Sequence, residues 1–119
     1  MSIRLQFPKN GLYAITPDNL FDGRHGLQKI ESTLKGGAKA IQLRQKTHLT
    51  NDFLIKIGKA IKTICVEYEA VFIINDDVDL ALKVNADGVH LGKTDCSYKD
   101  ARMLLGHNKL IGVSCYNSI

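Results

Sequence analysis

The 119-residue sequence has few of the side chains that usually hold zinc or form disulfides. It contains three cysteines, Cys65, Cys96 and Cys115, and no Cys-X-X-Cys pair. An odd, widely spaced set argues against both a disulfide framework and a zinc site. The four histidines are scattered and form no His-X-X-X-His pair, so we interpret them as structural or surface residues rather than metal ligands.

Long apolar runs and a strong charge imbalance are also missing. No apolar run is long enough to span a bilayer, and residues 1–10 lack the apolar core of a signal peptide. The formal net charge is only +4, and no block of basic residues alternates with aromatic ones, so nothing indicates a nucleic-acid partner. These absences predict a cytoplasmic protein that binds neither nucleic acid nor a membrane.

What the sequence does contain is a repeated alternation of β-rich runs and amphipathic segments. Leu27, Ile30 and Leu34 follow helical spacing, whereas the apolar run at 71–75 is typical of a strand buried on both faces. The pattern predicts strands at residues 11–16, 38–45, 71–75, 88–91 and 110–114, with amphipathic helices between them. Such alternation implies parallel β-α-β units with right-handed crossovers.

Two architectures are built from such units, an open doubly wound sheet and a closed (β/α)8 barrel. The open sheet usually carries a glycine-rich phosphate loop after its first strand, but here that strand runs into Thr16-Pro17-Asp18. Polar residues instead follow the second to fifth strands, at the end where a barrel has its active site. We therefore predict an α/β fold of parallel (β/α) units that forms the N-terminal half of a TIM barrel.

The length of the chain limits this prediction. A complete barrel needs about 200 residues or more, whereas residues 1–119 supply four β/α units and a fifth strand. We expect residues 1–119 to form a single partial domain, the front portion of a longer protein. Two open sheet edges would remain, so we expect the isolated chain to form homo-oligomers or otherwise self-associate.

The segment AIQLRQK, residues 40–46, places polar side chains at every second position. Alternate side chains of a strand share one face, so Gln42, Arg44 and Lys46 would point together. The two cations could simply extend from a strand end into solvent. That explanation leaves Gln42 unaccounted for, whereas a closed barrel would turn all three toward its mouth, where the cations could hold phosphate oxygens.

Acidic residues follow the third and fourth predicted strands. Asp77 is placed to cap the next helix, whereas Asp76 lies closer to the strand end, where a barrel would turn its carboxylate toward the mouth. Asp95 is either a loop residue before the following helix or a second carboxylate at the mouth. Two carboxylates on neighbouring strand ends suit Mg²⁺, which combines one or two of them with substrate phosphates. Together with the cations they suit a pyrophosphate, as a leaving group or only as a handle.

Four segments of the sequence together resemble the thiamine phosphate synthase family, also called thiamine-phosphate pyrophosphorylase. They are QLRQK at 42–46, FIINDD at 72–77, ADGVHLGKTD at 86–95 and IGVS at 111–114, and the likeness runs from about Gly11 to the last residue. The resemblance implies a (β/α)8 barrel and a Mg²⁺-dependent transferase. Such an enzyme couples 4-amino-5-hydroxymethyl-2-methylpyrimidine diphosphate to 4-methyl-5-(2-phosphoethyl)thiazole, releasing pyrophosphate and forming thiamine phosphate.

The resemblance also implies roles for residues at the strand ends. The pyrimidine diphosphate would be bound by five residues, Gln42, Arg44, Lys46, Asn75 and Ser114. Of these, Arg44, Lys46 and Ser114 would be the catalytic residues, with the two cations on the phosphates. Asp76 and Asp95 would be the Mg²⁺ ligands. The family reaction is dissociative: pyrophosphate departs first, and the thiazole nitrogen captures the pyrimidinylmethyl cation, so no protein nucleophile is needed.

This sequence departs from the family pattern in two ways. Gln45 stands where the second-strand motif usually has an acid, and because Gln45 is out of phase with the ligand row we expect a mild effect. The later glycine- and threonine-rich loops of the family, which bind pyrophosphate and the thiazole phosphate, lie beyond Ile119. We therefore expect negligible synthase activity from the isolated 119-residue chain.

Two alternatives stay open at this point. A thiazole tautomerase-like isomerase shares the barrel but would use a histidine near the fifth strand and no metal, and that neighbourhood here reads Ser114-Cys115-Tyr116. A non-catalytic half-barrel that binds anions is the second alternative, although nothing in the sequence indicates a dedicated partner surface. Mg²⁺ dependence separates the synthase from the isomerase.

Overall fold

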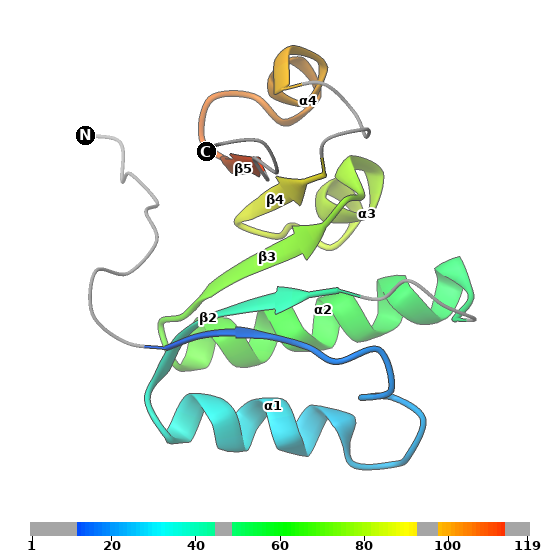
Figure 1. The fold of residues 1–119 in the computed structure, drawn as a ribbon, viewed down its shortest axis with the longest axis vertical. Coiled ribbons are helices and arrows are strands. Elements are labelled where there is room, and N and C mark those ends of the chain that lie inside the picture. The colour runs from blue at the N-terminus through cyan, green and yellow to red at the C-terminus, as the bar shows by residue number, and fades with distance from the viewer. Residues whose placement is uncertain (1–11, 45–48, 93–97, 114–119) are drawn as a thin grey trace, which may run out of the picture.

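The computed structural model describes residues 12–44, 49–92 and 98–113. In these ranges strands and helices alternate along the chain, as the sequence pattern predicts (Figure 1). The elements are β1 (Leu12–Ile15), α1 (Gly26–Lys35), β2 (Ala38–Leu43), α2 (Asn51–Glu67), β3 (Val71–Asn75), α3 (Val78–Lys83), β4 (Gly88–Leu91), α4 (Tyr98–Leu105) and β5 (Leu110–Val113).

The strands form one sheet in the order β1-β2-β3-β4-β5, and every neighbouring pair is parallel. A doubly wound sheet reverses its strand order at a switch point, whereas a barrel adds each strand beside the previous one. The observed order has no reversal. The architecture is therefore that of consecutive barrel strands, which confirms the predicted fold class over the open-sheet alternative.

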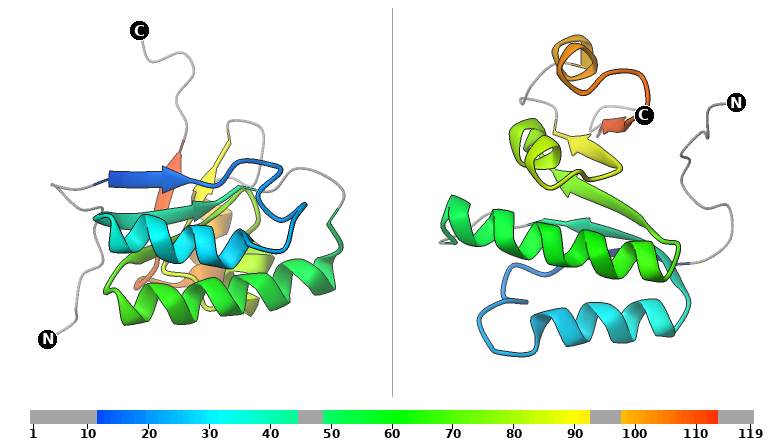
Figure 2. Two further views of the ribbon diagram at one scale, coloured as in Figure 1. Left: turned by 90° about the horizontal axis from the view of Figure 1, so that it is seen from below. Right: turned by 180° about the vertical axis from the view of Figure 1, so that it is seen from behind.

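The two faces of the sheet have different contents. One face packs against the helices and contributes the apolar side chains Ile41, Leu43, Phe72, Ile74, Val89 and Leu91 to a single buried cluster. Figures 1 and 2 show the helices together on this side of the sheet. The opposite face, which we call the inner face, carries Tyr13, Gln42, Ile73, Asn75 and His90 at the alternate positions. The inner face therefore carries the polar side chains Tyr13, Gln42, Asn75 and His90 beside the apolar Ile73.

Local sequence signals explain where the helices begin. The Thr50 hydroxyl accepts a hydrogen bond from the backbone amide of Phe53 at the start of α2. At the start of α3 the Asp77 carboxylate accepts one from the backbone amide of Leu80 at 2.9 Å. Both are N-caps that pair an otherwise unbonded first-turn amide, so the capping role predicted for Asp77 is confirmed. None of the helices within the described ranges is long and apolar enough to cross a membrane.

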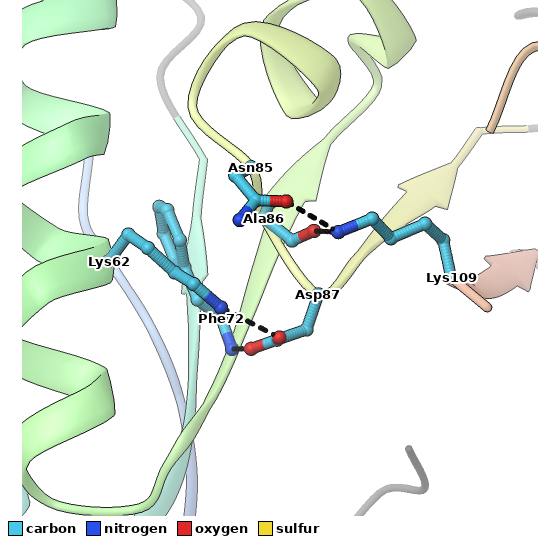
Figure 3. Close-up of polar contacts among 6 residues, drawn as sticks. All are labelled: Lys62, Phe72, Asn85, Ala86, Asp87 and Lys109. Atoms are coloured by element: carbon cyan, nitrogen blue, oxygen red, sulfur yellow. Dashed lines mark hydrogen bonds and ion pairs between the residues drawn. The ribbon is translucent and has the colours of Figure 1, made fainter. Parts of the chain in front are cut away.

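A polar cluster fastens the starting ends of β3, β4 and β5 (Figure 3). The Asp87 carboxylate accepts hydrogen bonds from the Lys62 ammonium at 2.9 Å and from the backbone amide of Phe72 at 2.7 Å. Close by, Lys109 donates to the Asn85 side chain and to the Ala86 carbonyl. These bonds join α2 to the sheet and hold the strands in register at the end opposite the predicted site.

Candidate functional site

The carboxyl ends of β2, β3 and β4 lie at one edge of the sheet, toward which their arrowheads point in Figure 1. Two amide side chains and a phenol form a hydrogen-bonded relay across the inner face here. Asn75 donates from Nδ2 to Gln42 Oε1 at 2.9 Å, and Gln42 donates from Nε2 to the Tyr13 hydroxyl at 2.8 Å. We call these three residues the amide relay. It brings together two of the predicted substrate-binding residues, Gln42 and Asn75.

The strand register explains why these three side chains meet. Gln42 pairs with Ile15 of β1 and with Ile73 of β3. Tyr13 lies two residues before Ile15, and Asn75 lies two residues after Ile73. The relay therefore runs diagonally across β1, β2 and β3. Diagonal neighbours on one face are close enough for long side chains to touch. Gln42 is only 4% exposed, which makes its two hydrogen bonds important, because an unpaired buried amide is costly.

The end of β2 is fastened to the end of β1 through Thr16. The backbone amide of Thr16 donates to the Gln42 carbonyl at 3.0 Å, and the backbone amide of Arg44 donates to the Thr16 hydroxyl at 3.0 Å. Thr16 is itself buried. Arg44 therefore leaves the sheet from a fixed backbone position, one residue beyond β2, with an exposed side chain.

Asp76 occupies the junction between β3 and β4. Its backbone amide donates to the His90 carbonyl at 2.7 Å, and its Oδ1 accepts a hydrogen bond from the backbone amide of Gly92 at 2.7 Å. Its φ angle is +63°, in the left-handed region, where aspartate is among the few side chains that are enriched. The carboxylate is thus held at the carboxyl edge of the sheet, one residue beyond Asn75 of the relay.

Only two of the other predicted site residues, Arg44 and Asp76, lie within the described ranges. Arg44 and Asp76 follow the ends of neighbouring strands, β2 and β3, next to the amide relay. Lys46, Asp95 and Ser114 lie outside the described residues, as does Gln45. In the part of the chain that the structure describes, no three His, Cys, Asp or Glu side chains gather into a metal site. The proposed partner of Asp76 in such a site, Asp95, is outside that part.

Tyr13 is the site residue that sequence reasoning missed. It is 38% exposed, and burial raises the pKa of its hydroxyl while the hydrogen bond from Gln42 opposes the rise, so the phenol stays protonated at neutral pH. The sequence did contain a signal, because Tyr13 alternates with the apolar Ala14 in a predicted strand. Without the register between β1 and β2, however, nothing pointed from Tyr13 to Gln42.

A small hollow of about 70 Å³ lies between β1 and α1, lined by residues that include Ala14, Ile30 and Ile41. Ala14 and Ile41 belong to the helix-facing side of the sheet. No member of the amide relay lines this hollow, nor do Arg44 and Asp76. The carboxyl edge of the inner face is therefore the better candidate for a functional site.

Comparison with known proteins identifies a family for this chain. A family model described as thiamine monophosphate synthase matches residues 12–119. The chain is 44% identical over 109 residues to the thiamine-phosphate synthase of Nitrosospira multiformis, covering 92% of this chain and 46% of that protein. It is 43% identical over 118 residues to the thiamine-phosphate synthase of Methylococcus capsulatus, covering 99% of this chain and 52% of that protein.

A solved structure is similar as well. The thiamine phosphate pyrophosphorylase of Pyrococcus furiosus superposes with a TM-score of 0.78 at 39% sequence identity, over 89% of this chain and 50% of that one. The chain thus spans about half the length of the relatives it matches. Strand order, the polar carboxyl edge and a match over nearly the whole chain lead to one conclusion: this chain belongs to the thiamine monophosphate synthase family.

Proposed function

We propose that this chain supplies the pyrimidine diphosphate-binding half of a thiamine phosphate synthase. That enzyme would join the pyrimidine diphosphate to the thiazole phosphate and release pyrophosphate. The observation that carries the proposal is the placement of Gln42 and Asn75 in one relay at the carboxyl edge of the sheet, with Arg44 and Asp76 following the ends of β2 and β3. Support comes from the identity of about 40% to synthases over nearly the whole chain.

The side chains at this edge suit a diphosphate and Mg²⁺. The Asp76 carboxylate is a hard oxygen ligand held at the edge by its bond to Gly92, and Asp95 is proposed as the second ligand. When bound, Mg²⁺ would neutralise charge on the phosphate oxygens. Arg44 would grip the diphosphate as a two-pronged donor, and Lys46 would act as a point charge. Ser114 would donate a further hydrogen bond.

These residues would act by stabilising charge rather than by forming a bond to the substrate. As pyrophosphate leaves, negative charge grows on the departing oxygens, where fixed cations are most effective in a site that excludes water. The pyrimidine ring would carry the positive charge until the thiazole nitrogen attacks its methylene carbon. The amide side chains of the relay, Gln42 and Asn75, would hold the pyrimidine ring.

Three further parts of the proposal concern the protein as a whole. Because the chain spans about half the length of its relatives, we propose that the 119 residues alone show negligible turnover. We propose a cytoplasmic location. We also propose that copies of the chain self-associate, because β1 and β5 each have only one neighbouring strand in the described sheet.

A binding experiment with a charge-matched control tests the proposal. The pyrimidine diphosphate is titrated into the chain with Mg²⁺, and into the variants Arg44→Gln and Lys39→Gln. Arg44 follows the carboxyl end of β2 and Lys39 lies at its other end, and both side chains are exposed. We expect Arg44→Gln to weaken binding by about tenfold or more, the loss of a charge-assisted hydrogen bond. We expect Lys39→Gln to change it less than about twofold, as for a distant, screened charge.

Equal weakening by both variants would show that only net charge matters and would contradict a diphosphate site at this edge. The same titration in the presence of a metal chelator examines the Mg²⁺ requirement. Diphosphate affinity that survives the chelator unchanged would contradict the metal-dependent synthase and favour the isomerase. Turnover by the 119 residues at the rate of a complete synthase would contradict the proposed lack of activity.

A further inference from the structure

The buried Gln42 amide uses both of its ends within the relay. Its Nε2 donates to the Tyr13 hydroxyl and its Oε1 accepts from Asn75 Nδ2. With only 4% of Gln42 exposed, solvent does little to pair either end. The plane of the Gln42 amide is therefore set by residues on the strands either side of it, and one of these is Tyr13.

We propose that Tyr13 is a positioning residue of the site, which acts through Gln42 to orient the Asn75 side chain. Because Asn75 gives an Nδ2 hydrogen to Gln42, its Oδ1 is turned elsewhere. No group among the described residues donates to Asn75 Oδ1. Asn75 therefore offers an oriented acceptor at the end of β3. Resting on the proposed function, we assign this acceptor to a donor group of the bound pyrimidine, such as its exocyclic amino group.

The hydroxyl of Tyr13 is the part that matters for this role. A phenylalanine in its place would keep the ring but leave Gln42 Nε2 without its acceptor. The Gln42 amide would then have a single partner, and turning it over would exchange the atoms that face Asn75. In the turned state Asn75 would present Nδ2 instead of Oδ1, so a ligand donor would meet another donor. Tyr13 thus keeps the acceptor available by holding the amide next to it.

The chain contains a matched control for this substitution. Tyr68, at the end of α2, also donates from its phenol to a side chain, Glu31, at 3.0 Å. Tyr68→Phe therefore removes the same atom and breaks a comparable hydrogen bond on the helix side of the sheet. Tyr13→Phe and Tyr68→Phe can be compared with the wild-type chain in every measurement, with unfolding free energies recorded to show that both variants fold.

Nuclear magnetic resonance of the side-chain amides tests the relay without any ligand. We expect exchange of the Gln42 side-chain amide hydrogens to be at least about tenfold faster in Tyr13→Phe than in wild type, since one hydrogen bond is lost. Tyr68→Phe should leave it unchanged. Gln42 hydrogens that exchange equally fast in wild type and Tyr13→Phe would overturn the inference whatever the ligand results are.

Two probes then separate positioning of the pyrimidine from binding of phosphate. The probes are the hydroxymethylpyrimidine without its diphosphate, and inorganic pyrophosphate with Mg²⁺. We expect Tyr13→Phe to weaken pyrimidine binding about five- to tenfold, the effect of one hydrogen bond, while pyrophosphate binding stays within about twofold. Tyr68→Phe should change neither.

The remaining outcomes are each decisive. Unchanged pyrimidine affinity in Tyr13→Phe, with both probes bound by wild type, overturns the positioning role and leaves the proposed function standing. An equal loss of affinity for both probes also overturns the positioning role, because an equal loss would reflect general loosening of the sheet. A wild-type chain that binds neither probe overturns the proposed function, and the assignment of the Asn75 acceptor with it.

Discussion

The Asp76 carboxylate accepts a hydrogen bond from the backbone amide of Gly92 at 2.7 Å, which fastens the end of β3 to the end of β4. The residue proposed to bind Mg²⁺ is thus also part of the frame that holds the site together. Its left-handed backbone, with φ of +63°, adds a second structural demand on the side chain at this position.

Substitutions at Asp76 should separate its structural and metal-binding roles. Asp76→Asn keeps an oxygen for Gly92 and tolerates the left-handed backbone, so we expect the free energy of unfolding to change by less than about 1 kcal/mol. Asp76→Ala loses both features, so the free energy of unfolding should fall by about 2–4 kcal/mol, from the backbone strain and the lost hydrogen bond together. Both variants should weaken Mg²⁺ binding in the presence of pyrophosphate by at least about tenfold, because the anionic ligand is gone. Chemical denaturation and metal titration measure the two effects, and wild-type metal affinity in Asp76→Asn would remove Asp76 from the proposed metal site.

The bond between Lys62 and Asp87 should contribute more to stability than an exposed ion pair. Lys62→Met keeps the aliphatic length but leaves the carboxylate of Asp87, whose side chain is 12% exposed, with one fewer donor. We expect a loss of about 1–3 kcal/mol in the free energy of unfolding.

Lys83→Met is the matched control, since Lys83 pairs with Asp79 four residues earlier on α3 and both side chains are more than half exposed. It should cost less than about 1 kcal/mol, as is usual for exposed pairs. Equal losses for the two variants would contradict a special role for the cluster in Figure 3.

Gly88, the first residue of β4, should be intolerant of any side chain. A Cβ atom there would overlap the backbone carbonyl of Leu110 on β5, which can move only if the strand moves. Gly88→Ala should therefore lower the free energy of unfolding by about 1–3 kcal/mol or more.

Gly36→Ala provides the comparison, because a Cβ at Gly36 would lie 3.4 Å from the nearest atom, the Ser32 carbonyl oxygen, and φ is −76°. It should be neutral or stabilising by up to about 1 kcal/mol, through a less flexible unfolded chain. Thermal unfolding of the two variants measures the difference, and a neutral Gly88→Ala would mean that β5 can shift freely.

The buried thiol of Cys65 should make stability fall at alkaline pH. Burial raises the pKa of this thiol from 9.0 to about 12, and the nearby Asp87 carboxylate adds to the rise while Lys62 opposes it. Between these values the unfolded thiol loses its proton while the folded one keeps it. The unfolded state then binds fewer protons, so the free energy of unfolding decreases as pH rises through this window.

The size of this effect is measured against Cys65→Ala. Relative to that variant, wild type should lose up to about 1.4 kcal/mol per pH unit above pH 9. Subtracting the two unfolding free energies cancels the contributions of other groups whose pKa shifts are the same in both proteins. Tyr13 and Lys109 are among these groups. A difference in unfolding free energy that stays constant from pH 8 to 11 would contradict the buried, protonated thiol.

Much of the fold followed from local patterns. The apolar run at 71–75 is β3 at the predicted bounds, and the capping role predicted for Asp77 is present. These features depend on side chains a few residues apart, whose preferences are visible in the chain itself. The predicted second strand included Arg44, whereas β2 ends at Leu43. Beyond Leu43, the backbone amide of Arg44 donates a hydrogen bond to the Thr16 hydroxyl. This contact joins residues 28 apart, so no local pattern contains it.

The candidate site shows the same division. The sequence by itself determined which polar residues stand near strand ends, Gln42, Arg44, Asn75 and Asp76 among them, because the alternation of side chains along a strand is a local property. Lys46 and Asp95 stay predictions from the sequence pattern, and Ser114 stays a prediction from the family resemblance. Only the tertiary structure decided the strand order, and with it that Tyr13 meets Gln42 and that Gln42 meets Asn75. Those contacts depend on the register between strands, which is set by the packing of the whole sheet against its helices.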